Sequence, residues 1–237
     1  MWGPPPIRPL TGRERCPTIW VTGHPYYGRE ESQVVRISDE ERARVRERLL
    51  AAAAQRFAED GFERANINTI SRQAGLAKGT VYNYFASKEE LFGEVIRAAA
   101  RRAVALWSRA PAGSSLEGCL RALAAADVQV LREREPFVKV LVREAFAFRP
   151  ATYPLILEHM APFLEAVGRC LERGAARGDL RGDLPPERLA LLFVGILGLL
   201  YVQHWGTGGA WPALDEIPDL AATLFLHGAA PPRRGRP

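Results

Sequence analysis

The stretch from Ala65 to Lys88 constrains the fold of this chain more than any other. Apolar side chains recur at helical spacing in its first part, at Ile67, Ile70 and Ala74. Gly75 follows where a helix would stop, and a second short helical run extends from Lys78 to Tyr84. Two short helices joined by a turn that opens with glycine predict a helix-turn-helix motif. Its second helix would enter the DNA major groove, supported by the first.

The charge of this stretch agrees with a nucleic-acid partner. Between Ile67 and Lys88 there are three basic residues, Arg72, Lys78 and Lys88, and no acidic residue. A surface that binds phosphates is expected to have such a balance. The net charge of the whole chain, +5, permits a polyanionic partner without requiring one.

The order of residues in this region is more specific than its periodicity. The informative positions are Ala74-Gly75, Lys78-Gly79-Thr80, Tyr82, Phe85, Ser87-Lys88, Glu89 and Leu91, preceded by Leu49, Ala52, Ala53, Phe57 and Gly61. This pattern resembles the DNA-binding signature of the TetR/AcrR family of bacterial transcriptional regulators. The resemblance spans Val45 to Val95. It implies a sequence-specific DNA-binding regulator, most often a homodimeric repressor, and no enzymatic activity.

Several side chains are expected to contact DNA. Asn66 is a suitable N-cap for the first motif helix, and Lys78 and Thr80 supply hydrogen-bond donors. Gly79 would let the second helix approach the sugar-phosphate wall, and Asn83 has the carboxamide that reads adenine. By resemblance, Thr80, Tyr82, Asn83 and Tyr84 lie near the DNA face and Lys88 points to the backbone. The predicted DNA-binding set is Asn66, Thr69, Lys78, Gly79, Thr80, Tyr82, Asn83, Tyr84 and Lys88.

Two positions in the second motif helix need separate interpretations. Phe85 is assigned to the core. For Tyr82 we expect a ring that is partly packed against the protein and a hydroxyl that contacts a phosphate. Ala77 stands where the family usually has Ser or Thr, so the recognition helix lacks its side-chain N-cap. Loss of such a cap typically costs about 1 kcal/mol. We therefore expect a softer helix start, held by Val81 and Phe85.

The rest of the chain predicts an all-α fold, with a three-helix DNA-binding domain followed by a helical ligand-binding and dimerisation domain. Serine caps and prolines give the helix starts, and glycines and prolines give most of the ends. The expected helices run from Ser38 to Asp60, Leu91 to Trp107, Leu116 to Arg134, Pro136 to Arg149, Pro154 to Arg177, Pro186 to Trp205, and from between Leu214 and Pro218 to His227.

The expected domains are a disordered extension over 1–37, a DNA-binding domain over 38–96, a ligand-binding and dimerisation domain over 97–228, and a disordered basic tail over 229–237. The extension is either a basic arm that reaches into the DNA minor groove or a segment included because the translation start was placed too far upstream. It lacks the basic region and apolar run of a signal peptide, which favours a cytoplasmic protein.

The apolar run from Leu189 to Val202 predicts a dimer interface. Its 14 residues are too few to span a bilayer, and a surface helix of a monomer would not be apolar on every side. By resemblance, the last two long helices pair with their two-fold mates, and the dimer reads a palindromic operator in double-stranded DNA. The alternative is a helix buried within its own subunit. The predicted interface residues are Leu192, Gly195, Leu199, Leu220 and Leu224.

Aromatic and polar side chains of the C-terminal helices offer material for a pocket that would take a small hydrophobic or aromatic effector. By resemblance to the family, such a pocket lies among the helices from Leu116 to Trp205. Most of the aromatic residues are also consistent with an ordinary core. The predicted pocket residues are Trp107, Phe137, Arg143, Phe146, His159, Phe163, Tyr201 and His204. We expect no cofactor.

Two other functions remain open. Cys16, Cys119 and Cys170 are odd in number and widely spaced, which argues against a disulfide framework or a zinc site. A redox-responsive regulator using Cys119 or Cys170 is nevertheless one alternative. An enzyme or a helical bundle without DNA function is the other, although no nucleophile elbow, phosphate loop or metal-ligand cluster is present in the sequence.

Overall fold

The computed structural model describes residues 38–109, 115–180 and 183–227 of the chain. Their regular structure is helical throughout, which confirms the predicted all-α class. The predicted extension over 1–37 and the tail over 229–237 lie outside the described residues. The described residues form one compact unit.

The N-terminal part contains α1 (Asp39–Arg64), α2 (Ile67–Gln73), a short 3-10 helix η1 (Thr80–Asn83) and α3 (Lys88–Trp107). Predicted caps begin three of the four. The side chains of Ser38, Asn66 and Ser87 each accept a hydrogen bond from a backbone N–H in the first turn of α1, α2 and α3.

Helix α1 is interrupted near the residue where we expected it to end. Gly61 has φ of 80°, a left-handed conformation that glycine adopts without steric cost, and a further turn follows to Arg64. Behind this break, Phe62 meets Phe92 of α3 edge-on with ring centroids 5.0 Å apart, and Phe57 meets the same ring at 5.5 Å. The aromatic cluster fixes α1 against α3.

The second motif helix differs from its prediction. We expected a helix from Lys78 to Tyr84, but only Thr80–Asn83 is helical, and in the 3-10 form. Gly79 is its N-cap, with φ of 82°, and no side chain caps its first turn, whereas Ala77, the expected capping position, lies two residues earlier. Val81 and Phe85 are almost fully buried, as predicted, and they hold the short helix in place.

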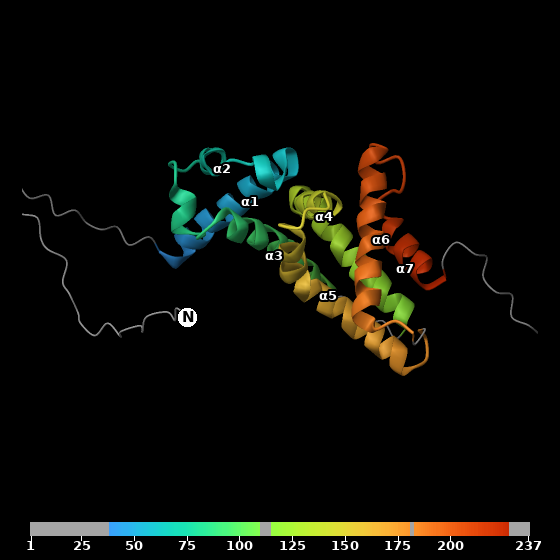
Figure 1. The fold of residues 1–237 in the computed structure, drawn as a ribbon. Helices are drawn as coiled ribbons and strands as arrows, with labels where there is room; N and C mark the ends of the chain where they lie inside the picture. Colours follow the sequence, from blue (N-terminus) through green and yellow to red (C-terminus); the bar gives the residue numbers. More distant parts are fainter. Residues whose placement is uncertain (1–37, 110–114, 181–182, 228–237) are drawn as a thin grey trace, which may run out of the picture. The chain divides into compact units, whose positions relative to one another are not determined.

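The C-terminal part contains α4 (Leu116–Phe146), α5 (Tyr153–Ala176), α6 (Pro186–Gly206) and α7 (Ile217–His227). Helix α4 contacts α1, α3, α5, α6 and α7, so it connects the helix-turn-helix region with the C-terminal helices (Figure 1). The two helices predicted over 116–149 form this one element. It is broken at Arg134, where φ and ψ are −146° and 52°, two residues before Pro136.

The cysteine interpretation was wrong for one pair. Cys119 of α4 and Cys170 of α5 are joined as a disulfide, with their Cα atoms 6.2 Å apart. Their separation of 51 residues gave no sign of this, because the pairing depends on how α4 packs against α5. Both side chains are buried.

The length argument for α6 also needs correction. The apolar run lies in a helix of 21 residues, and by length and composition alone α6 is the one helix in the described ranges that could cross a membrane. Core helices of soluble proteins pass the same test. Here α6 packs on α5 and α7, and its Phe193 meets Phe225 of α7 with centroids 5.4 Å apart.

Candidate nucleic-acid interface and effector cavity

The outer face of η1 carries most of the predicted DNA-contacting residues. Lys78, Tyr82 and Asn83 are exposed, and Gly79 and Thr80 are half-buried beside them. The Tyr82 side chain is 58% exposed, so its ring contributes to the surface and not to the core. A lysine, a carboxamide and a phenol on one outward face supply donors for phosphates and for base edges.

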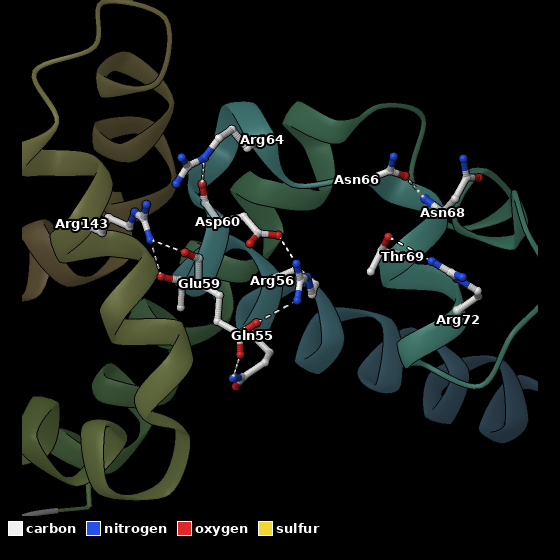
Figure 2. Close-up of polar contacts among 11 residues, drawn as sticks. Gln55, Arg56, Glu59, Asp60, Arg64, Asn66, Asn68, Thr69, Arg72 and Arg143 are labelled. Atoms are coloured by element: carbon white, nitrogen blue, oxygen red, sulfur yellow. Dashed lines mark hydrogen bonds and ion pairs between the residues drawn. The ribbon is translucent and has the colours of Figure 1, made fainter.

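The start of α2 adjoins this face. Asn66 Oδ1 accepts the Asn68 N–H at 2.8 Å, and Thr69 Oγ1 accepts a hydrogen bond from Arg72 at 3.4 Å (Figure 2). The Asn68 N–H is therefore already satisfied within the protein, while Arg72 and Asn66 remain exposed. Arg72 adds a positive charge next to Thr69.

Lys88 and Tyr84 contact other parts of the protein as well. The Lys88 ammonium donates to the Glu63 carbonyl at 2.9 Å and lies 4.8 Å from the centre of the Phe62 ring. An ammonium has three donors, so this bond leaves capacity for a phosphate. Tyr84 is half-buried, with the Arg42 guanidinium 5.7 Å from its ring centre.

Two arginines of α1 support the motif, and the predicted DNA-binding set does not include them. Arg42 lies by Tyr84, and Arg48 donates to the Ala74 carbonyl at the end of α2. A Cβ on Gly75 would stand 2.7 Å from the Arg48 guanidinium, so glycine is needed both for its φ of 69° and for this contact. The only sequence signal was the run of alternate arginines in α1.

A second polar junction joins α1 to α4. Glu144, only 1% exposed, accepts the Phe62 N–H at 2.9 Å, directly after the break at Gly61. Arg143 donates to the carbonyls of Ala58 and Glu59 at 2.6 and 2.8 Å (Figure 2). Arg143, predicted as a polar group of the pocket, thus binds the last turns of α1.

A cavity of about 520 Å³ lies among α4, α5 and α6. Three of the predicted pocket residues, Phe146, Phe163 and Tyr201, belong to its wall. Most of the remaining lining is aliphatic or aromatic: Leu141, Val142, Ala145, Phe148, Pro150, Ile156, Leu157, Met160, Leu164, Leu191, Val194, Gly195, Leu197 and Gly198. The polar lining residues are Asp127, Arg149, Tyr153 and Tyr201. A volume and lining of this kind suit a small apolar ligand.

Besides Arg143, four predicted pocket residues do not line this cavity: Trp107, Phe137, His159 and His204. Trp107 packs against the core and Phe137 is buried in it. His204 Nδ1 lies 2.9 Å from the Pro212 carbonyl.

His159 is buried between α5 and α3. Its Nδ1 lies 2.6 Å from the Arg97 guanidinium, and a Cβ on Gly93 would overlap its ring. Burial and, second, the charge of Arg97 lower the pKa of His159, so its ring is neutral at physiological pH. Its position explains why Gly93 is needed at the α3–α5 contact.

Asp127 is the cavity residue that sequence reasoning missed. Tyr201 of α6 donates to its carboxylate at 2.6 Å. Burial raises the pKa of Asp127 to about 6, an effect that the Tyr201 hydrogen bond partly offsets. The same burial raises the pKa of Tyr201 well above its usual value. One acidic residue in the apolar sequence Leu123 to Leu131 was the available signal.

The predicted dimer residues lie on an uncovered apolar face. Leu192 and Leu199 of α6 are 54% and 51% exposed, and Leu224 of α7 is 38% exposed. Gly195 is exposed between them, and Leu220 is half-buried. Leu191 and Val202 extend this surface, which we call the α6–α7 face.

Metal chemistry has no candidate centre in the described ranges, where no group of three or more His, Cys, Asp or Glu side chains could hold an ion. Arg173 donates to the sulfur atoms of Cys119 and Cys170 at 3.3 and 3.5 Å. The disulfide is therefore enclosed by protein groups.

Comparison with known proteins gives consistent matches. Residues 49–95 match the family model described as bacterial regulatory proteins, tetR family. The HTH-type transcriptional repressor AcnR of Corynebacterium efficiens is 26% identical over 75% of this chain and 90% of its own length. The fatty acid degradation regulator FadR of Bacillus halodurans shares the fold with a TM-score of 0.65, at 21% identity over 81% of this chain and 97% of its own.

A further solved structure, the transcriptional regulator FadR of Bacillus subtilis in complex with stearoyl-CoA, has a TM-score of 0.64 at 19% identity, over 78% of this chain and 99% of its own. The fold and the exposed η1 face define a helix-turn-helix DNA-binding transcriptional regulator. Together with these matches, they show that residues 49–95 form a DNA-binding domain of the kind found in the tetR family of bacterial regulatory proteins. The proteins named here are regulators, and they favour neither the redox alternative nor an enzyme.

Proposed function

We propose that the protein is a homodimeric repressor that leaves a palindromic operator when a small apolar or aromatic effector enters the cavity. In this proposal residues 38–96 bind DNA, residues 97–228 bind the effector and the second subunit, and the protein acts in the cytoplasm. Support comes from the name of AcnR as a repressor and from the stearoyl-CoA in the Bacillus subtilis FadR structure.

The observation that carries the proposal is the position of the second half of α4. Leu141, Val142 and Ala145 face the cavity, while Arg143 and Glu144 between them bind the end of α1. Arg149 of the cavity wall also lies 3.7 Å from Glu144. A ligand that moves this segment therefore changes contacts of the DNA-binding part directly.

Repression would be relieved through geometry. Two recognition elements read half-sites about one helical turn apart, so both bind only at one separation. An effector with higher affinity for another position of α4 would shift the population away from the DNA-bound form.

Selection of bound sequences from random double-stranded DNA tests the proposal. We expect the full-length protein to recover a palindrome with half-sites about one helical turn apart. Recovery of half-sites alone would contradict the dimeric reading. Recovery of no motif from protein shown by mass spectrometry to carry no ligand would contradict specific DNA binding.

A separate experiment tests whether the effect of the ligand passes from α4 to α1 through Glu144 and Phe62. Glu144→Ala removes the acceptor of the buried Phe62 N–H, so we expect operator affinity to respond less to effector than in the wild type. Glu144→Gln keeps an acceptor oxygen and should restore the response. Equal responses in all three proteins, measured by fluorescence anisotropy, would exclude this route.

A further inference from the structure

The polar groups of the cavity are few and of unequal availability. Of its 20 lining residues, four have polar side-chain groups, and Asp127, Arg149, Tyr153 and Tyr201 come from three separate segments. No lysine, histidine or glutamate lines it. The chemistry of a bound polar group is therefore decided mainly by Asp127 and Arg149.

Arg149 is the weaker partner for a ligand. Its guanidinium lies 3.7 Å from the carboxylate of Glu144, which offsets its positive charge. Its side chain is 40% exposed as a whole, but the Nη1 atom that faces Glu144 is buried, so this atom is directed to that carboxylate and away from solvent. An anionic group would compete with a buried carboxylate for this arginine.

Asp127 has the opposite character. Tyr201 provides the hydrogen bond to this carboxyl within the described part of the chain, and Asp127 is one of the residues that line the cavity. A carboxylate has about four lone-pair positions, so one phenol leaves most of its capacity unused. With its pKa at about 6, the group is mostly ionised above pH 7. A buried negative charge without a cationic partner is unfavourable, and pairing removes that cost.

We infer that the effector is an apolar molecule with one protonated amine, and that this amine pairs with the carboxylate of Asp127. The inference rests on the proposed role of the cavity as the effector site. The apolar body lies against Phe146, Met160 and Phe163. Tyr201 donates to one oxygen of Asp127, and the amine would pair with the other.

A matched series of ten-carbon probes tests the charge preference. Calorimetric titration of the full-length protein with decylamine, 1-decanol and decanoate at pH 7.5 compares a cation, a neutral donor and an anion on the same chain. We expect decylamine to bind about tenfold or more tightly than 1-decanol, as for a charge-assisted hydrogen bond, and decanoate to bind no better than 1-decanol.

Variants assign the preference to one side chain. Asp127→Asn should remove the advantage of decylamine over 1-decanol, whereas Tyr201→Phe should keep most of it. Glu117→Gln removes a carboxylate from an exposed site on the same helix and serves as the charge control. Thermal unfolding of each variant verifies that it is folded.

The outcomes separate the two proposals. Similar affinities for all three probes, tightest binding of decanoate, or an unchanged preference in Asp127→Asn would overturn the amine inference and leave the effector cavity in place. If no probe binds to the wild type, or if decylamine binds without lowering operator affinity, the proposed function fails as well.

Discussion

Two residues of the predicted DNA-binding set, Lys78 and Asn83, are expected to have different roles in binding DNA. Lys78 is exposed beside Gly79 and offers a point charge, whereas Asn83 offers a donor and an acceptor together. Charge sets affinity for any DNA, and paired donors and acceptors set sequence preference.

We therefore expect Lys78→Ala to weaken binding to all DNA sequences and to reduce the slope of log affinity against log salt by about 1 per subunit. Asn83→Ala should instead relax preference at one base pair of each half-site, at a cost of about 1–3 kcal/mol. Anisotropy titrations at several salt concentrations on operator and scrambled DNA distinguish them. The same salt slope in Lys78→Ala and wild type would remove this residue from the interface.

Asp127 makes a stability prediction that is independent of any ligand. Its folded-state pKa of about 6 exceeds the ordinary 3.8, so the folded protein disfavours the charged form and loses stability as pH rises between these values. Asp127→Asn should raise the free energy of unfolding at pH 7.5 by up to about 3 kcal/mol, because each pKa unit corresponds to about 1.4 kcal/mol. Urea unfolding at pH 7.5 and pH 4 measures this, and the gain should shrink at pH 4. A loss of stability at both values would contradict the assignment.

At the scale of elements, sequence predicted the helices well where local signals decide them. Ser38 and Asn66 cap the helices that they were expected to begin, and Ser87 and Ser115 cap α3 and α4. Pro136 marked the interruption of α4, although the chain continues as one element across it.

The sequence did not predict contacts that depend on packing between segments far apart in the chain. Asp127 and Tyr201 are 74 residues apart and Glu144 and Phe62 are 82 apart, so neither pair has a local pattern. Cys119 and Cys170 meet for the same reason. The short form of η1 was missed because helical periodicity does not reveal that Gly79 adopts a left-handed conformation.

The break in α1 can be tested as an element. Gly61→Ala puts a side chain at a φ of 80°, 3.2 Å from Glu144, so we expect a loss of about 1–3 kcal/mol in unfolding free energy. Gly168→Ala is the matched control, because it lies within α5 with no atom near the added Cβ. This change should stabilise the protein by about 0.5–1 kcal/mol. Equal effects of the two in urea unfolding would contradict the proposed need for glycine at 61.

At the scale of the whole molecule, the α6–α7 face is the surface on which we expect a partner. Leu192, Leu199 and Leu224 are exposed on two helices that pack together, and exposed apolar patches mark interaction sites. A two-fold dimer buries the same patch of both subunits.

The double change Leu192→Glu and Leu199→Glu should convert the dimer to a monomer and lower operator affinity about tenfold or more. Sedimentation velocity gives the oligomeric state, and anisotropy gives the affinity. Ala125→Glu, at an exposed site on α4, controls for the added charge. A double variant that stays dimeric would show that another surface joins the subunits.

The break of α4 at Arg134 divides that helix into two segments, and both contribute residues to the cavity wall. The segment before it carries Asp127, which faces the polar group of the proposed ligand. The segment after it carries Glu144, which holds Phe62. Changes in the segment of α4 before Arg134 can therefore give the cavity a new ligand specificity, while the contact of Glu144 with Phe62 is kept.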